Sequence, residues 1–173
     1  RKVPAARRLS QVADVVVTWG GARRAWAGEA PDRGLRVQGQ AYRWRWLTDR
    51  GVPVVVVGDS PLSPDDLDIC AARHPRELGR CTFAAQPAVA GSGLPVQQDA
   101  VALVVADPSP EARAGSAVEL LDLTPWICPG GQCPVVIGHV AVHRAGDHVT
   151  ATYASTLAPQ LAAAVDSALA GSR

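Results

Sequence analysis

Three apolar runs dominate the pattern of hydrophobic and polar positions along the chain. They are residues 13–18 (ADVVVT), 52–57 (VPVVVV) and 118–123 (VELLDL). Their apolar residues mostly follow one another, without the alternation of a half-exposed strand. Such runs are typical of strands that helices cover on both faces. The pattern therefore predicts three buried strands of a parallel sheet.

Helical patterns lie between and after these runs. Residues 40–50 (QAYRWRWLTDR) predict an amphipathic helix that stops before Gly51, and residues 109–116 predict a short helix with Pro110 near its start. Residues 157–170 combine alanines with periodic leucines, which predicts a C-terminal helix. The alternation of strands and helices predicts an α/β fold: three α/β/α layers around a mainly parallel, doubly wound sheet of the flavodoxin-like type.

Two segments do not fit this alternation. Residues 60–81 hold several prolines and aspartates and are predicted to form a loop. Residues 87–95 (PAVAGSGLP) are predicted to form a flexible connection. Both lie between the second and third strands, so this connection is expected to be long and irregular.

Size and composition limit the possible functions. At 173 residues, with 47% hydrophobic and 19% charged residues, the chain fits one globular domain over residues 1–173. The net charge of +1, the scattered arginines and the few aromatic residues give no reason to expect nucleic acid as a partner. No apolar run approaches the length of a membrane span. The chain begins Arg-Lys-Val and contains no methionine, so we expect a fragment whose N-terminal part, with any anchor or export signal, precedes Arg1.

The four cysteines form two close pairs in the sequence: Cys70 with Cys81, and Cys128 with Cys133. An even number in local pairs favours two disulfide-closed loops and an oxidising, extracytoplasmic compartment. Free thiols are one alternative. Another is a zinc site that combines these thiolates with His74, His139 or His143, but neither pair has the tight C-x-x-C spacing that is usual for zinc.

An Asp-His pair, Asp147–His148, lies on a predicted loop just before a helix. In a parallel sheet such a loop follows the carboxyl edge, where doubly wound folds bind their ligands. A neutral imidazole there can take a proton from a serine hydroxyl, provided that a carboxylate holds its other nitrogen. Asp147 is the nearest acid, although sequence neighbours often point apart. The alternative is a surface histidine beside an aspartate that caps the helix.

Two further groups carry possible chemistry. Gly58-Asp59-Ser60 follows the second strand and resembles the triplet that carries an esterase nucleophile, but the following Pro61 and Asp-rich sequence favour a strand-ending turn. His139 and His143 are four residues apart in a β-branched segment, which predicts a shared strand face and structural or pocket-lining roles. The sequence predicts no metal site from these histidines.

The segment 122–159, DLTPWICPGGQCPVVIGHVAVHRAGDHVTATYASTLAP, resembles the end of the SGNH-hydrolase-like domain that is fused to the type 3 membrane acyltransferases of bacteria. That family combines a strand, D-x-T-P-W, two cysteines, and D-x-x-H-L-T before the last helix. Residues 52–75, VPVVVVGDSPLSPDDLDICAARHP, are similar to its strand, G-D-T/S-P turn and cysteine. The resemblance covers about residues 12–164.

The resemblance implies an O-acyltransferase that works outside the membrane on cell-surface carbohydrate and needs no metal or organic cofactor. An upstream membrane acyltransferase domain would deliver the acyl group, which would pass through an acyl-serine to a sugar hydroxyl, with His148 as the base. Ser60 matches the family's later turn, so the nucleophile block is expected upstream of this chain. Ser60 and His148 in a free-standing esterase form the alternative.

The resemblance also shows one departure from the family pattern. The family's catalytic aspartate stands three residues before the histidine, where this chain has Ala145, and Asp147 is the only local acid. Asp147 would then orient His148 through an altered loop. Otherwise the domain is degenerate and binds glycan or positions its membrane partner without catalysis.

Overall fold

The computed structural model describes residues 13–19, 32–106, 117–144 and 148–171. Its main sheet has three parallel strands in the order β1-β2-β4: β1 (Val16–Thr18), β2 (Val54–Val57) and β4 (Val118–Leu121). Each strand lies within one of the three predicted apolar runs, and all three are shorter than predicted. The three parallel strands are therefore confirmed.

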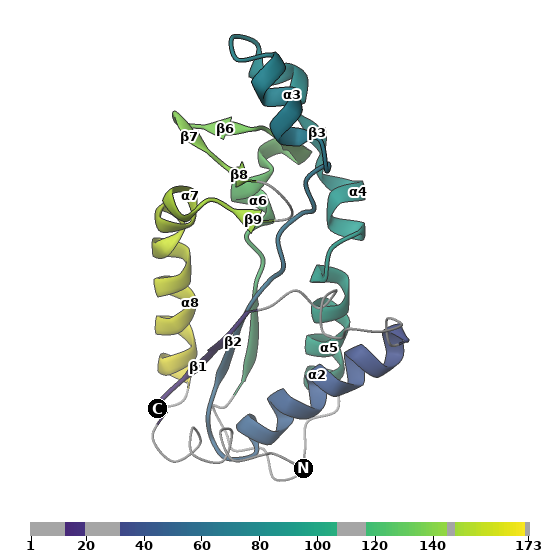
Figure 1. Ribbon diagram of the computed structural model, residues 1–173. Coiled ribbons are helices and arrows are strands. Elements are labelled where there is room, and N and C mark those ends of the chain that lie inside the picture. Colours follow the sequence, from purple (N-terminus) through teal and green to yellow (C-terminus); the bar gives the residue numbers. More distant parts are fainter. Residues whose placement is uncertain (1–12, 20–31, 107–116, 145–147, 172–173) are drawn as a thin grey trace.

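Helices cover both faces of this sheet, as Figure 1 shows. On one face lie α2 (Arg33–Thr48) and α5 (Leu94–Ala106), and on the other lies α8 (Ala158–Gly171). The chain places α2 between β1 and β2 and α5 between β2 and β4, so both crossovers run on the same face. After β4 the chain reaches the opposite face with α8.

The central strand, β2, shows why its apolar run is uninterrupted. Val54 and Val56 pack in one hydrophobic cluster with Trp44 of α2 and Ala100 of α5. Val55, which lies between them in the sequence, packs in a separate cluster with α8. Successive strand residues point to opposite faces, so a strand with helices on both sides needs an apolar residue at every position. The packing confirms the predicted α/β fold with its three layers.

Two of the predicted helices are present with changed limits. The helix predicted over residues 40–50 already begins at Arg33, and the glycines in its first part weaken the helical pattern in the sequence. Gly51 follows this helix with a φ of 80°, a left-handed conformation that favours glycine. The helix predicted over residues 157–170 is α8, and α7 (Ala151–Thr156) precedes it. The short helix predicted over residues 109–116 lies outside the described residues.

The connection between β2 and β4 is more helical than predicted. Residues 60–81 contain α3 (Leu67–Arg73) and the 3-10 helix η1 (Leu78–Cys81), and residues 87–95 contain parts of α4 (Ala85–Ala90) and α5. The predicted loop is therefore confirmed only for residues 60–66 and 74–77, and the prediction of a flexible connection over residues 87–95 is wrong. Pro87 and Pro95 lie in the first turns of α4 and α5, where a proline removes no helical hydrogen bond. Pro61 and Pro64 lie in the non-helical segment before α3.

A second group of short elements lies beyond the carboxyl ends of β2 and β4, at the end of the molecule that carries α3 (Figure 1). It consists of three antiparallel strand pairs and two short helices: β3 (Phe83–Ala84) with β5 (Gln132–Cys133), β6 (Val136–Ile137) with β7 (Val140–Ala141), β8 (His143–Arg144) with β9 (His148–Val149), α6 (Thr124–Ile127) and η2 (Pro129–Gly131). Ile127, Val142 and Tyr153 belong to the hydrophobic cluster of this group.

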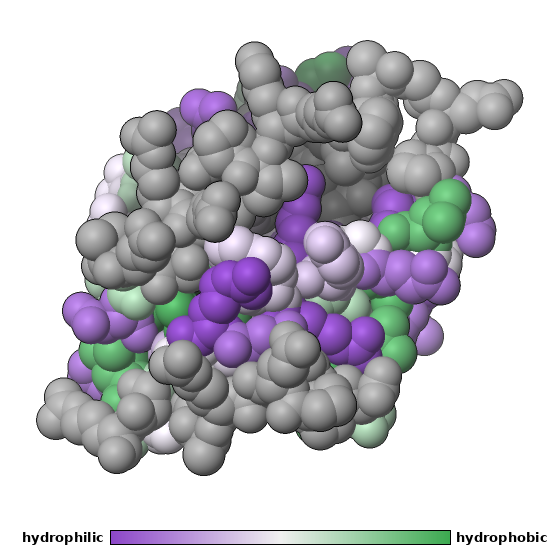
Figure 2. All heavy atoms as spheres, turned by 90° about the horizontal axis from the view of Figure 1, so that it is seen from below, coloured by the Kyte–Doolittle hydropathy of each residue, from purple (hydrophilic) through white to green (hydrophobic). Residues whose placement is uncertain are grey.

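The opposite end of the molecule has a different surface. Figure 2 shows that hydrophilic residues run across the middle of its described part. Figure 2 views the molecule from the end that lies opposite α3 and the group of short elements in Figure 1. Among the described helices, none combines the length and the apolar character needed to cross a membrane.

Candidate functional site

His148 lies in β9, the last strand before α7, and its side chain is exposed. β9 pairs with β8 so that Arg144 stands opposite His148. Val149, the next residue, packs against the same hydrophobic cluster as Leu123, which follows β4. Because β4 belongs to the parallel sheet, this packing places His148 near the carboxyl edge of the sheet, where doubly wound folds bind ligands. Its role as a base stays a prediction.

Thr150 fixes the backbone directly after His148. Its amide donates to the Val142 carbonyl oxygen over 2.9 Å, and its hydroxyl donates to the Ala141 carbonyl oxygen over 2.5 Å. The same hydroxyl oxygen accepts from the amide of Tyr153 over 3.1 Å, which makes Thr150 the N-cap of α7. The Thr150 side chain thus caps α7 and also bonds this helix start to β7. These bonds hold the backbone directly after His148 in place.

The D-x-T-P-W motif anchors the same region. Asp122 accepts a hydrogen bond at Oδ1 from the amide of Thr124 over 2.8 Å, at the start of α6. The Tyr153 hydroxyl donates to the Trp126 carbonyl oxygen over 2.7 Å and so connects α7 to α6. Burial raises the pKa of Tyr153, which keeps this phenol protonated as a donor. The motif has a structural explanation: it holds the helix that follows His148 against the end of β4.

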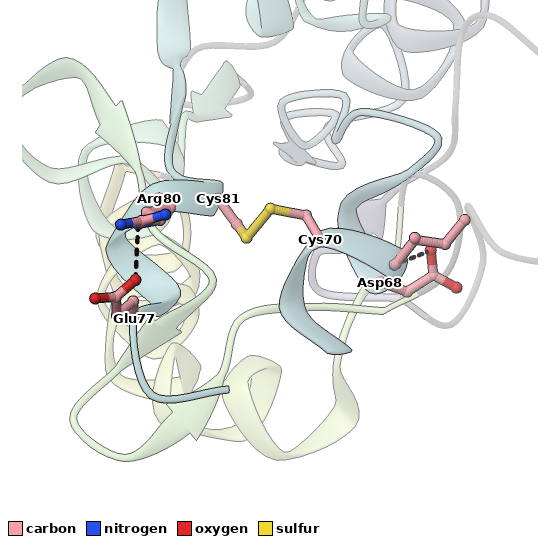
Figure 3. Close-up of a disulfide and its surroundings, with 6 residues drawn as sticks. Asp68, Cys70, Glu77, Arg80 and Cys81 are labelled. Atoms are coloured by element: carbon pink, nitrogen blue, oxygen red, sulfur yellow. Dashed lines mark hydrogen bonds and ion pairs between the residues drawn. A yellow bond between two sulfur atoms is a disulfide. The ribbon is translucent and has the colours of Figure 1, made fainter. Parts of the chain in front are cut away.

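Both predicted cysteine pairs are disulfides. Cys128–Cys133 closes the loop between α6 and β5, and Cys70–Cys81 joins α3 to η1. Figure 3 shows the second bond, with the ion pair of Arg80 Nε and Glu77 Oε2 at 2.8 Å beside it. All four thiols are used in these bonds, so the alternatives of free thiols and thiolate ligands for zinc are not realised.

The Gly58-Asp59-Ser60 triplet ends β2 and leads into an irregular segment, so the predicted strand-ending turn is not present at these residues. The Asp59 carboxylate accepts from the amide of Gly93 over 2.7 Å, and the Asp59 amide donates to Gln97 Oε1 over 2.6 Å. Gln97 is buried and donates from Nε2 to the Val57 carbonyl oxygen over 3.2 Å. These bonds tie the end of β2 to the beginning of α5. Ser60 lies in the non-helical segment that precedes α3, so no helix starts at its position.

His139 and His143 do not share a strand face, and this prediction is wrong. His139 has a φ of 68° and, together with Gly138, forms the two-residue turn between β6 and β7. His143 lies in β8, is only 7% exposed, and its ring centre lies 5.3 Å from that of Phe83. Burial lowers the pKa of His143 and favours its neutral form. The turn separates the two histidines, because the segment folds back between them.

A pocket of about 250 Å³ lies against His143. It is bordered by α3 and the residues just before it on one side, and by Val135, β7 and β8 on the other. The sequence predicted a structural or pocket-lining role for His143, and the structure places it in the pocket wall. Asp65, Asp68 and Arg144, which also line the pocket, were missed. No local pattern could reveal them, because the two walls come from segments far apart in the sequence.

Two residues of the predicted site cannot be placed. Asp147, the predicted acid partner of His148, lies outside the described residues, and so does Ala145. The described part of the candidate site therefore consists of His148 on β9, the irregular segment at Ser60 and the pocket beside His143.

The comparison with known families decides the assignment. A family model described as "SGNH domain (fused to AT3 domains)" matches residues 22–163. The chain belongs to this SGNH family. The match includes β2 and β4 of the main sheet, both disulfides and His148, and β1 lies before it. It confirms the resemblance seen in the sequence. It makes the chain an acyltransferase-associated domain. The searches of curated proteins and of solved structures gave no match.

Proposed function

We propose that this SGNH domain is the extracytoplasmic part of an O-acyltransferase that transfers an acyl group to cell-surface carbohydrate. One observation carries the proposal: His148 stands exposed on a strand that Thr150 anchors near the carboxyl edge of the sheet. The family description supports an AT3 membrane domain as the partner that delivers the acyl group. Both disulfides support an oxidising compartment.

The proposed reaction has two balanced steps. In the first, a serine hydroxyl gives its proton to His148, its oxygen bonds to the acyl carbon, and the donor's leaving group departs with the proton. In the second, a sugar hydroxyl gives its proton to His148 and its oxygen bonds to the acyl carbon. The bond between the acyl carbon and the serine oxygen then breaks, and the proton returns to the serine. The products are an acyl ester of the sugar and the original serine.

The position of Ser60 supports a nucleophile from another segment. A nucleophilic serine of this kind usually begins a helix whose amides help to bind the oxyanion. Ser60 instead lies in the irregular segment after β2, and α3 begins only at Leu67. We therefore propose that the serine comes from a G-D-S-H-like block that precedes these residues. Asp147 remains the proposed orienting acid.

The test compares two histidine variants in the full protein that carries this domain. His148→Ala is expected to lower acyl transfer to surface polysaccharide by about 10²–10⁴-fold, because a positioned general base contributes that much. His139→Ala is the matched control, since it removes an exposed histidine from the β6–β7 turn. The readout is the amount of base-labile acyl ester on the isolated polysaccharide. Equal ester contents in both variants would show a non-catalytic, glycan-binding or positioning domain instead.

The esterase alternative has its own variant. If the chain were a free-standing esterase, Ser60→Ala would abolish hydrolysis of a small aryl acetate. The irregular segment at Ser60 favours an unchanged rate, because Ser60 lacks the helix start that such a nucleophile uses.

A further inference from the structure

Trp126 is an exposed tryptophan that the fold holds in one orientation. Its exposed fraction is 42%, although the next residue of α6, Ile127, is buried. The indole N–H of Trp126 donates to the side-chain oxygen of Gln160 over 3.1 Å, and the side-chain nitrogen of Gln160 donates to the Leu157 carbonyl oxygen over 3.0 Å. Because the N–H is the only polar group of an indole, the ring offers a ligand apolar surface alone.

The backbone that carries the indole is fixed as well. The Trp126 carbonyl oxygen accepts from the Tyr153 hydroxyl, and its amide donates to the Leu123 carbonyl oxygen over 3.1 Å. The loop that follows is closed by the disulfide between Cys128 and Cys133. A rigid aromatic side chain loses little conformational entropy when it binds a ligand, and tryptophan is enriched among the residues that dominate binding energies. Trp126 therefore has the properties of a preformed binding surface.

Trp126 lies near the strand that carries the candidate base. Ile127 of α6 and Val149 of β9 pack in one hydrophobic cluster, and their neighbours in the sequence, Trp126 and His148, are both exposed. Gln160, which holds the indole, lies in the first turn of α8 just after α7, while His148 lies just before α7. The 6 residues of α7 span about 9 Å at 1.5 Å per residue. A short oligosaccharide is long enough to cover such a distance.

The apolar surface at Trp126 is too small for a protein or membrane partner. The exposed residues nearest to it in the sequence are two prolines, two glycines and a glutamine: Pro125, Pro129, Gly130, Gly131 and Gln132. The other large hydrophobic residues that are exposed in the described ranges lie on other elements: Trp19, Leu35, Tyr42, Ile69 and Val105. Interaction patches for macromolecules usually measure on the order of several hundred Å². A tryptophan exposed by 42% offers at most about 100 Å², which suits one small ring.

A sugar ring matches this surface in its chemistry. A pyranose ring presents C–H groups on its faces and hydroxyl groups around its edge, and C–H hydrogens are attracted to the electron-rich face of an indole. Gln132 is exposed in the adjoining loop, and its amide both donates and accepts hydrogen bonds. At Gly130 and Gly131 the backbone is uncovered, since a Cβ atom at either position would meet nothing within 4 Å. The surroundings of the indole thus leave room for the hydroxyl groups of a stacked ring.

We propose that one sugar ring of the acceptor carbohydrate stacks on the indole of Trp126, while another ring of the same chain carries the hydroxyl that His148 deprotonates. This inference rests on the proposed function for the identity of the ligand. Trp126 touches the substrate away from the reacting atoms, so it sets the affinity for the acceptor. Gln160 is a positioning residue, because it acts only through the indole.

The first test measures binding apart from catalysis. The 173-residue chain is titrated with trisaccharides of glucose, galactose and N-acetylglucosamine, while NMR follows the indole N–H signals of its tryptophans. The Trp126 signal is assigned by its absence in Trp126→Phe. At least one trisaccharide is expected to shift this signal in a saturable manner, with a Kd of about 1 mM or below. Glycerol, which has no ring to stack, should leave it unchanged. No saturable shift with any trisaccharide, or equal shifts with glycerol, would overturn the proposal.

Variants identify the residues that bind the sugar. Trp126→Ala removes the stacking surface, so binding should weaken by at least about tenfold. Trp126→Phe keeps a smaller ring and should weaken binding by about threefold, which serves as the test if the alanine variant fails to fold. Gln160→Leu frees the indole and should also weaken binding by about threefold. Tyr42→Ala, which removes an exposed aromatic residue from α2, is the control and should bind as the unmodified chain does. Unchanged binding in a folded Trp126→Ala or in Trp126→Phe would contradict the assignment.

The second test separates this inference from the proposed function. In the full protein, Trp126→Ala should form the acyl-serine as fast as the unmodified protein, while the KM for the acceptor rises by at least about tenfold. An unchanged KM together with loss of transfer in His148→Ala would remove the inference and leave the proposed function standing. Trp126-dependent sugar binding together with normal transfer in His148→Ala would do the reverse. An unchanged KM with an indole that a tryptophan-modifying reagent cannot reach would show that another part of the full protein covers Trp126, against the proposal.

Discussion

At the scale of single residues, His143 shows how packing decides a histidine's chemistry. The side chain is held in β8 between the ring of Phe83 and the pocket, and this burial lowers its pKa below the ordinary value of about 6.5. Between the lowered pKa and the ordinary one, the unfolded chain binds a proton that the folded chain does not. Stability must therefore fall as the pH drops through this range.

A pH series tests this consequence. The free energy of unfolding is expected to decrease as the pH falls through the ordinary histidine pKa of about 6.5, and the decrease should be smaller in His143→Phe, which has no titrating group at this position. The measurement is denaturant unfolding followed by circular dichroism at each pH. His139→Ala, at an exposed turn, should keep the full decrease. The same pH dependence in His143→Phe as in the unmodified chain would show that His143 does not titrate as described.

Gly58 is a second residue whose identity the packing explains, because there is no room for a side chain at its position. A Cβ atom at this position would lie 2.8 Å from Leu94 Cδ1 and 3.2 Å from the Leu121 carbonyl oxygen. Leu94 is only 1% exposed and has no space to withdraw. Gly58→Ala is therefore expected to destabilise the fold by about 1–3 kcal/mol, the usual range for overpacking.

The control for Gly58 is another glycine with open space around it. Gly39 lies inside α2, and a Cβ atom there meets nothing within 4 Å. Gly39→Ala should raise stability by about 0.5–1 kcal/mol, because alanine loses less backbone entropy in a helix. Thermal unfolding of the two variants should shift in opposite directions, by about 2–4 °C per kcal/mol for a chain of this size. A Gly58→Ala protein as stable as Gly39→Ala would contradict the close approach.

At the scale of elements, the start of α7 is the feature that positions His148. Thr150 caps this helix and also donates to the Ala141 carbonyl oxygen. Thr150→Ala should destabilise the domain by about 1 kcal/mol through loss of the cap, and acyl transfer should fall as well because β9 loses an anchor. Thr152→Ala, on the exposed side of α7, should change stability by less than about 0.5 kcal/mol. Unfolding midpoints and transfer rates of both variants provide the check.

Elements also show where the sequence was informative and where it was not. β2 was predictable because helices on both faces require its unbroken run of valines. α5 was missed because it packs against both α2 and the sheet, so apolar residues surround it and no helical stripe remains in its sequence. Gly93 and Pro95 also hid the start of α5, because glycine and proline usually indicate a loop. In the structure, the Asp59 carboxylate and the Ser92 hydroxyl accept from backbone amides at the start of this helix and so cap it.

At the scale of the whole molecule, the candidate site was predictable in part. The place of His148 follows from the chain order, since a segment after the last strand of a parallel sheet meets the sheet's carboxyl edge. The pocket beside it was not predictable. Asp68 of α3 and His143 of β8 line the same pocket only because α3 packs against the strand pairs. A local sequence pattern contains no information on this packing.

The two ends of the molecule therefore differ in their chemistry. The end beyond the carboxyl edges of the strands carries His148, the pocket and both disulfides, while hydrophilic residues cross the middle of the described opposite end (Figure 2). This division agrees with the proposal that the catalytic site lies at the end that carries His148.

The most direct measurement of the central claim is the acylation state of the full protein after incubation with an activated acyl donor. Intact-protein mass spectrometry should detect one acyl group on the unmodified protein and on His139→Ala. It should detect none on His148→Ala, because the serine then keeps its proton. Acylation of His148→Ala to the same extent and at the same rate as His139→Ala would contradict the role proposed for His148.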